Sequence, residues 1–232
     1  MTLRQATLLV ALMGFPAGAE TLHYSVNWQS GLSLGEGSLR SEKLPADPDL
    51  APGGDKAGGW KFEMMLDAAV PGFSIRDEYS STADDKLCSS VVHKTVARGA
   101  RKSEESVQID AHAQTATREG KGGGKSQYSV PECVHDAMAF LQFVRQELKQ
   151  GRVAPQQPVI LGSKYDVHLT FTGTETIRVA GEAVEADRVR AVIKGPQVDV
   201  TADLYFSHDA VRTPVLARIP LPLGIFTVEL LP

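Results

Sequence analysis

Cysteine is scarce in this sequence, which contains only two among its 232 residues. A small scaffold held together by many disulfides is therefore excluded. A surplus of basic residues is also missing, because 24 Lys and Arg stand against 28 Asp and Glu. Binding to nucleic acid needs a basic surface that neutralises phosphates, so we expect no nucleic-acid partner. Beyond residue 15 no apolar run approaches the roughly 20 residues of a membrane span, so we expect no transmembrane segment in the mature chain.

The longest apolar run lies at the N-terminus and has the features of a signal peptide. Arg4 supplies a positive charge, residues 6–15 are apolar, and Ala17-Gly18-Ala19 forms the small-x-small site that precedes cleavage. We therefore expect residues 1–19 to be removed after Ala19. Residues 20–232 are then expected to form a single β-rich domain in the periplasm.

Export gives the two cysteines, Cys88 and Cys133, a structural meaning. An oxidising compartment favours a disulfide between them. This bond would close a loop of about 46 residues and stabilise the fold by about 4 kcal/mol through loop-closure entropy. A reactive thiol or a metal pair is the alternative, but the sequence has no Cys-x-x-Cys spacing to support it.

Alternation of apolar and polar residues predicts a series of β-strands. In the segment 22–29, Leu22, Tyr24, Val26 and Trp28 alternate with polar neighbours, the period of a strand with one buried face. Turn residues such as Gly173, Gly181 and Ser207-His208-Asp209 separate the later strands. Further strands are expected at 38–43, 60–66, 74–81, two or three places between 84 and 127, 165–171, 175–180, 186–194, 198–206, 214–219 and 225–230, with a loop at 45–59 and a turn tip at 120–125.

One segment follows the helical period instead. Apolar residues between Pro131 and Gly151 fall at the i, i+3, i+4 spacing of an amphipathic helix, and we expect that helix at about 132–149. Strands at even spacing with one helix predict a mainly β fold. We expect a strongly curved antiparallel sheet, or a partly open β-barrel, of about ten strands packed against the helix.

Three motifs suggest chemistry, and each fails on spacing. Gly120–Ser126 (GKGGGKS) has the composition of a phosphate-binding loop, but Glu119 stands where that pattern needs glycine. Ser207-His208-Asp209 holds the residue types of a hydrolase triad, but neighbours on a strand face opposite sides. The six histidines have no metal-ligand spacing. We therefore assign no catalytic, cofactor-binding or metal-binding residue and expect no cofactor.

Apolar side chains leave two interpretations open. A curved sheet encloses either a packed core or a ligand cavity, depending on how side chains fill its interior. Aromatic and Met side chains suit an adaptable apolar pocket beneath the helix. The candidates for such a cavity are Trp28, Trp60, Phe62, Met64, Met138, Phe140 and Leu141.

Three segments have a recognisable pattern: HYSVNWQSGLSLGEGSL (23–39), CVHDAMAFLQFVRQELKQG (133–151) and LYFSHDAVRTPVLARIPLPLGIFTVEL (204–230). In these segments the chain resembles a bacterial exported family, the "domain of unknown function 3108". The resemblance implies an exported, mostly antiparallel β protein and supplies no activity. The positions that the family pattern covers are Asp136, Arg145, Asp209, Arg212 and Pro214.

Elementary chemistry suggests structural roles for three of these positions. Asp209 can cap a turn through its side chain. Pro214 can fix the backbone at the start of an edge strand. Arg145 can tie the helix to the sheet through a carboxylate.

Three functions remain compatible with the sequence. The first is a non-enzymatic periplasmic protein that binds an apolar or lipid-like ligand in a concave β cavity. The second is an envelope scaffold that pairs an exposed sheet edge with a partner protein. The third is a hydrolase whose site is assembled from distant residues, with His168 or His208 beside nearby acids.

Overall fold

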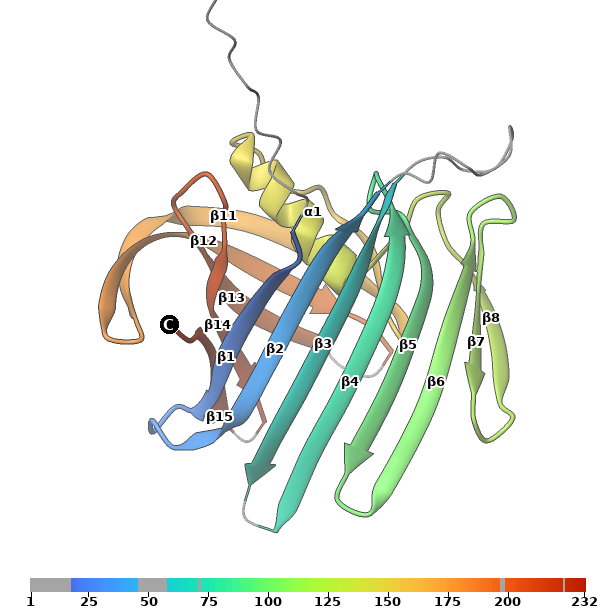
Figure 1. The fold of residues 1–232 in the computed structure, drawn as a ribbon, viewed down its shortest axis with the longest axis horizontal. Helices are drawn as coiled ribbons and strands as arrows, with labels where there is room; N and C mark the ends of the chain where they lie inside the picture. The colour runs from blue at the N-terminus through green and yellow to red at the C-terminus, as the bar shows by residue number, and fades with distance from the viewer. Residues whose placement is uncertain (1–17, 46–57, 71, 197–198, 223) are drawn as a thin grey trace, which may run out of the picture.

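The computed structural model describes residues 18–45, 58–70, 72–196, 199–222 and 224–232. These residues form fifteen strands and one long helix (Figure 1). The predicted loop at 45–59 lies almost entirely outside the described residues, as does nearly all of the predicted signal peptide. The elements are β1 (Glu20–Trp28), β2 (Ser33–Leu44), β3 (Gly59–Val70), β4 (Phe73–Asp84), β5 (Ser89–Arg98), β6 (Arg101–Asp110), β7 (Thr115–Gly120), β8 (Lys125–Ser129), β9 (His135–Asp136), α1 (Ala137–Lys149), β10 (Gln157–Leu161), β11 (Ser163–Val179), β12 (Glu182–Lys194), β13 (Asp199–Ser207), β14 (Pro214–Leu221) and β15 (Gly224–Leu230).

All fifteen strands belong to one sheet, in the order β8-β7-β6-β5-β4-β3-β2-β1-β15-β14-β13-β12-β11-β10-β9. Neighbouring strands are antiparallel except for β9 and β10, which pair in parallel. The first and last strands meet in the middle of the sheet, where β1 pairs with β15 from Tyr24↔Leu230 to Trp28↔Phe226. The expected mainly β fold with one helix and a strongly curved sheet is therefore confirmed.

The curvature brings β9 back against the start of β5. Ser89 donates a backbone hydrogen bond to the carbonyl oxygen of Val134 at 2.8 Å. The Ser89 hydroxyl also contacts the Asp136 carboxylate at 2.7 Å. The sheet thus nearly closes into a barrel at this seam, while β6, β7 and β8 continue beyond it.

Helix α1 lies on the concave side of the sheet (Figure 1). The helix contributes side chains to two apolar clusters. One side of the helix packs Phe140, Val144 and Leu148 against strands β10 to β13. The other side packs Met138 and Ala139 against Phe62 of β3 and its neighbours. The helix therefore fills one part of the interior and leaves the rest to the sheet side chains.

Three predictions about the elements were wrong in detail. The helix begins at Ala137 instead of residue 132, because β9 pairing and the bond at Cys133 hold the preceding residues extended. The sheet has fifteen strands instead of about ten, and the short strands β9 and β10 were not among the predicted segments. Gly173 marks a β-bulge within β11 instead of a turn, because the register shifts by one residue between Phe171 and Gly173.

Candidate ligand cavity

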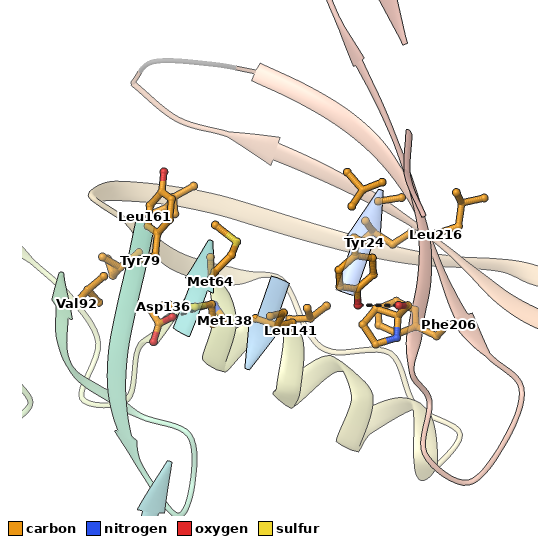
Figure 2. A pocket seen from close by; sticks show the side chains of 17 residues that line it. Tyr24, Met64, Tyr79, Val92, Asp136, Met138, Leu141, Leu161, Phe206 and Leu216 are labelled. Carbon is orange, nitrogen blue, oxygen red and sulfur yellow. Dashed lines mark hydrogen bonds between the residues drawn. The ribbon is translucent and has the colours of Figure 1, made fainter. Parts of the chain in front are cut away.

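A cavity of about 210 Å³ lies between helix α1 and the inner face of the sheet (Figure 2). Side chains from β1 to β5, β10 and β13 to β15 line it together with the start of the helix. Tyr79 and Leu161 lie at one end of the cavity, and Tyr24 and Leu216 lie at the other. Strands from both halves of the chain therefore form one apolar chamber.

The polar side chains that line the cavity are either hydrogen-bonded to other protein groups or uncharged. The Tyr24 hydroxyl donates to the carbonyl oxygen of Pro214 at 2.9 Å, and burial raises the pKa of Tyr24 far above its ordinary value. Burial also raises the pKa of Tyr79 to about 12. The Asp136 carboxylate accepts hydrogen bonds from Ser89 and from two backbone amides of α1. Both phenols are therefore neutral at physiological pH, and the chamber suits an apolar occupant.

The structure places some of the seven predicted cavity residues in the cavity lining and the others outside it. Met64, Met138 and Leu141 line the chamber. Phe62 and Phe140 instead belong to the packed clusters on either side of the helix, because both side chains are almost completely covered.

The two tryptophans lie outside the cavity lining. The ring of Trp28 packs against that of Phe226, with centroids 5.3 Å apart. Trp60 stacks on Phe62 at 5.8 Å, and the Lys43 ammonium lies over its ring. Both tryptophan rings pack against neighbouring side chains of the sheet and therefore do not reach the chamber.

Sequence reasoning missed most of the lining on the C-terminal half. Leu204, Phe206, Ala217 and Val228 lie on strands whose existence was predicted, and strand alternation could have assigned each to the inner face. No sequence signal placed those strands opposite α1. Ile160 was missed for another reason, because β10 itself was not predicted.

Asp136 connects the cavity to the helix. It is the N-cap of α1, with its Oδ1 atom accepting hydrogen bonds from the backbone N–H groups of Met138 at 2.8 Å and Ala139 at 3.3 Å. Such a cap satisfies amide groups that the helix cannot pair internally. Its backbone N–H also donates to the Ser89 hydroxyl at 2.7 Å. This one residue therefore fixes the start of the helix and the seam between β5 and β9.

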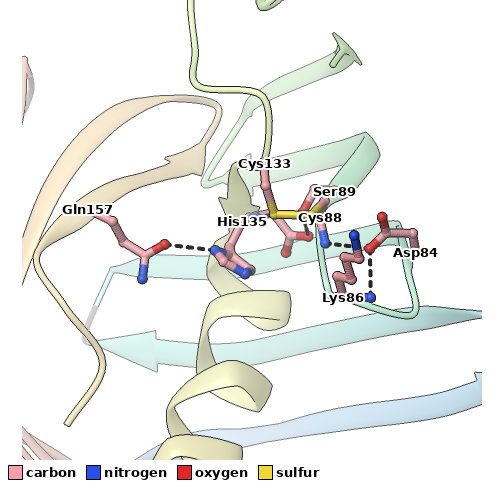
Figure 3. Close-up of a disulfide and its surroundings, with 8 residues drawn as sticks. Asp84, Lys86, Cys88, Ser89, Cys133, His135 and Gln157 are labelled. Carbon is pink, nitrogen blue, oxygen red and sulfur yellow. Dashed lines mark hydrogen bonds between the residues drawn. A yellow bond between two sulfur atoms is a disulfide. The ribbon is translucent and has the colours of Figure 1, made fainter. Parts of the chain in front are cut away.

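The cysteine pair forms the predicted disulfide (Figure 3). Cys88 directly precedes Ser89, so its disulfide with Cys133 closes the same seam covalently. Asp84 shapes the preceding turn, because its Oδ1 atom accepts hydrogen bonds from the backbone of Lys86 at 2.9 Å and of Cys88 at 2.8 Å. Burial lowers the pKa of nearby His135, which contacts Gln157 at 2.9 Å.

Arg145 ties the helix to the sheet through a carboxylate, as expected from the sequence. Its two terminal nitrogens contact the two carboxylate oxygens of Glu20 on β1, at 2.5 and 2.9 Å. The Arg145 side chain is buried, whereas that of Glu20 is partly exposed. The hydrogen bonds from Arg145 hold the pKa of Glu20 below its ordinary value, with burial opposing them.

This ion pair makes stability depend on pH. Because the folded-state pKa of Glu20 is lowered, its contribution is present above the unfolded pKa of about 4.3 and disappears as pH falls through the lower folded value. We expect Glu20→Met to lower the free energy of unfolding at neutral pH and to converge with the wild type in acid. Urea unfolding across this range measures the difference, with Glu42→Met at an exposed pair as the control. A gap that does not change with pH would contradict the assignment.

Asp209, Arg212 and Pro214 form the β13–β14 connection beside the cavity. The Asp209 carboxylate accepts hydrogen bonds from the backbone of Val211 and Arg212, both at 2.8 Å, which is the expected turn cap. These bonds hold the pKa of Asp209 below its ordinary value, although burial opposes them. Arg212 has a φ of 56°, a left-handed conformation that non-glycine residues seldom adopt. Pro214 lines the cavity at the start of β14, which lies between β13 and β15 and is not the expected edge strand; as the first residue of the strand, proline is tolerated there.

The Arg212 guanidinium contacts the carboxylate of Asp187 on β12. Asp187 is a buried carboxylate that also contacts Thr174 Oγ1 and His208 Nδ1, each at 2.7 Å. His208 therefore faces Asp187, whereas Asp209 caps the turn and the Ser207 hydroxyl accepts from Thr213 N at 2.8 Å. The three consecutive residues Ser207, His208 and Asp209 do not form a triad with one another.

Three further features concern the described part of the chain. Within it, no group of three or more His, Cys, Asp or Glu residues is arranged to hold a metal ion. Helix α1 is too short to cross a membrane, and no other helix in the described ranges could do so. The glycine-rich segment at 120–125 forms the turn between β7 and β8, with Gly120 N donating to Gly124 O at 2.9 Å.

Family and fold comparisons agree with this architecture. The profile of a family described as "Protein of unknown function (DUF3108)" matches residues 23–231. The chain belongs to the DUF3108 family. The match spans both halves of the sheet, so the cavity, the seam and the turn at Asp209 all lie within the family region. No functionally curated protein matches the sequence.

Solved structures extend the comparison of the fold. A β-barrel-like protein of the domain of unknown function DUF1849 from Brucella abortus is similar, with a TM-score of 0.58, 6% identity and coverage of 91% of this chain and 94% of that chain. A protein with a YmcC-like fold from Bacteroides fragilis aligns over 92% of this chain and 93% of that chain, with a TM-score of 0.33 and 10% identity. At such low identity the Brucella structure supports the fold of this DUF3108 member and nothing about its chemistry.

Proposed function

We propose that this DUF3108 protein is an exported, non-enzymatic protein of the periplasm that binds an apolar or lipid-like ligand in its concave cavity. The observation that carries the proposal is the apolar chamber of about 210 Å³ between α1 and the sheet. Its walls are almost entirely apolar, and concave apolar pockets of this kind are the usual binding sites of small apolar ligands.

The size of the chamber limits its occupant. An engineered cavity of about 150 Å³ with apolar walls stays dry and binds benzene. Drug-sized ligands occupy pockets of roughly 300 Å³ or more. The chamber of this protein falls between these volumes, which favours one acyl chain or a ring-sized apolar group.

The chemistry of the walls supports the same class of ligand. Met64 and Met138 contribute flexible, polarisable side chains, which adapt to ligands of variable shape. The Tyr24 hydroxyl is occupied by Pro214 and so leaves an apolar ring toward the cavity.

Export is supported by two independent observations. The segment 1–19 has the composition of a cleavable signal peptide. The disulfide between Cys88 and Cys133 is of the kind that persists in oxidising compartments such as the periplasm. Cleavage after Ala19 would keep Glu20, and with it the pair to Arg145, in the mature protein.

A residue that fills the chamber tests the proposal. Ala217 of β14 lines the cavity, so Ala217→Trp should occupy the space that a ligand needs. We expect this variant to lower the affinity for the neutral fluorescent probe N-phenyl-1-naphthylamine at least tenfold, about 1.4 kcal/mol of binding free energy. Probe titrations of the wild type and the variant measure the effect.

The matched control is Ala69→Trp, which places the same side chain at an exposed position of β3 outside the cavity lining. It should bind the probe like the wild type. Thermal unfolding of both variants checks that they fold, because overpacking of a filled core would cost roughly 1–3 kcal/mol. Equal probe affinity for all three folded proteins, or no binding by any of them, would rule out the cavity as the binding site.

A second function, as an envelope scaffold, is favoured by one feature. Strand β8 is the last strand on its side of the sheet in the described residues, and most of its side chains are exposed. A partner strand could pair with this edge. Backbone pairing would be blocked by Gln127→Pro, so loss of a crosslinked envelope partner in that variant, with probe binding intact, would favour this function.

A further inference from the structure

A charged cluster lies beside the Tyr79 end of the cavity and consists of Lys94, Glu105 and Arg118. The strand register places Lys94 directly between Tyr79 on β4 and Glu105 on β6. Arg118 of β7 donates to the Glu105 carboxylate through Nε, at 2.7 Å, and through a terminal nitrogen. All three side chains thus share the concave face of the sheet with Tyr79.

Two contacts place this charged cluster against the cavity. The Lys94 ammonium nitrogen lies 5.6 Å from the centroid of the Tyr79 ring. Gly162, next to cavity residue Leu161, has a φ of 74° and lies so close that an added Cβ would be 2.4 Å from Glu105 Oε1 and 3.4 Å from the Lys94 nitrogen. The charged cluster is therefore adjacent to both residues that form this end of the chamber.

The charges of the cluster do not balance. Two cations face one carboxylate, and Arg118 engages the Glu105 Oε2 atom. The Lys94 nitrogen forms a long ion pair with Glu105 Oε1 at 3.4 Å, and this Oε1 atom accepts no hydrogen bond. Only 20% of the Lys94 side chain is exposed, so little water can solvate its charge. Because an ammonium group has three N–H donors, a partly buried lysine with a single long ion pair is stabilised by a further acceptor at closer range.

We propose that Lys94 binds the carboxylate of a single-chain amphiphile whose apolar chain occupies the cavity, the chemistry of a free fatty acid. This inference rests on the proposed function and adds the charge of the headgroup. A carboxylate carries the single negative charge that the cluster lacks, whereas a phosphate monoester carries about 1.5 to 2 charges. Tyr79 lines the cavity and has the Lys94 ammonium over its ring, so a carboxylate bound to Lys94 lies next to this end of the chamber.

Matched ligands test the headgroup separately from the chain. Dodecanoic acid and dodecanol have the same chain, and only the first is an anion at neutral pH. We expect the wild type to bind dodecanoate about tenfold more tightly than dodecanol, as for a hydrogen bond to a charged group. Displacement of N-phenyl-1-naphthylamine below the micelle concentration measures both affinities on the unmodified protein.

Three variants test whether Lys94 causes the preference for dodecanoate over dodecanol. Lys94→Met keeps the length of the side chain and removes the charge, so both ligands should bind equally. Lys94→Arg keeps a cation and should retain most of the preference. Lys125→Met removes an exposed lysine that pairs with Glu119, and it should behave like the wild type.

The outcomes distinguish the proposed carboxylate site from the proposed apolar cavity. Equal wild-type affinity for the acid and the alcohol would overturn the carboxylate site and leave the apolar cavity standing. A preference that persists in folded Lys94→Met would likewise overturn the role of Lys94. Failure of both ligands to bind would overturn the proposed function and this inference together.

Discussion

Replacing both Cys88 and Cys133 with alanine is expected to lower the free energy of unfolding by about 4 kcal/mol. The disulfide joins positions separated by 45 residues, so its loss frees a long loop in the unfolded chain. In the folded protein the bond lies beside the hydrogen bond from Ser89 to Val134, which is where the curved sheet meets itself. Equilibrium urea unfolding of the wild type and the double variant measures the loss.

Reduction of the wild type gives an independent control for this prediction. Dithiothreitol should lower the stability of the wild type to that of the double variant and leave the double variant unchanged. Hydrogen exchange should also become faster at the Ser89 amide, because the seam then depends on noncovalent contacts alone. A double variant within 1 kcal/mol of the oxidised wild type would contradict the structural role of the bond.

Replacing Arg212 with methionine is expected to lower the free energy of unfolding by about 3 kcal/mol. Arg212 is the charged partner of Asp187, whose side chain is only 5% exposed. In the Arg212→Met variant, the remaining partners of Asp187 are the uncharged Thr174 hydroxyl and the partly exposed His208. Removing one member of a buried ion pair leaves a charge without compensation, which costs far more than losing an exposed pair.

The comparison variant for this prediction is Arg190→Met on the same β12 strand. Arg190 is largely exposed and pairs with Asp203, so its loss should cost less than about 1 kcal/mol. Combining Arg212→Met with Asp187→Asn should recover much of the lost stability, because the buried charge is then removed as well. If Arg212→Met alone unfolds like Arg190→Met, the buried pair does not stabilise this part of the sheet.

The local pattern of the sequence was enough to predict most strands but not their number. Alternation at Leu22 to Trp28 is unambiguous, because a strand with one covered face must repeat every two residues. Strand β10 escaped prediction because its short run, QPVIL, contains a proline and lacks polar alternation. The bulge at Gly173 escaped because a glycine between two strand-like runs signals a turn equally well.

The start of the helix illustrates a tertiary effect on a local signal. Residues from Val134 onward fit the helical period, and Pro131 suits a first turn. The parallel pairing of His135 with Val159 and the disulfide at Cys133 keep these residues extended until Asp136 caps the helix. Both constraints involve partners distant in sequence, which periodicity cannot reveal.

The cavity was the least predictable feature. Phe62 and Met64 have the same strand phase on β3, yet only Met64 lines the chamber, because α1 crosses over Phe62. Which inward residue meets the helix depends on the crossing geometry and not on residue type. The charged cluster around Lys94 was missed for a similar reason, since its residues come from a polar stretch that resembles a solvated hairpin.

The most direct test of the apolar cavity is native mass spectrometry of the protein isolated from cells, before and after denaturation. The account predicts a discrete additional mass of an apolar or single-chain amphiphilic compound on the wild type. That mass should disappear on denaturation and be absent from folded Ala217→Trp but present on Ala69→Trp. An additional mass on Ala217→Trp equal to that of the wild type would contradict the cavity as the binding site, as would bare wild-type protein that stays bare after incubation with dodecanoic acid.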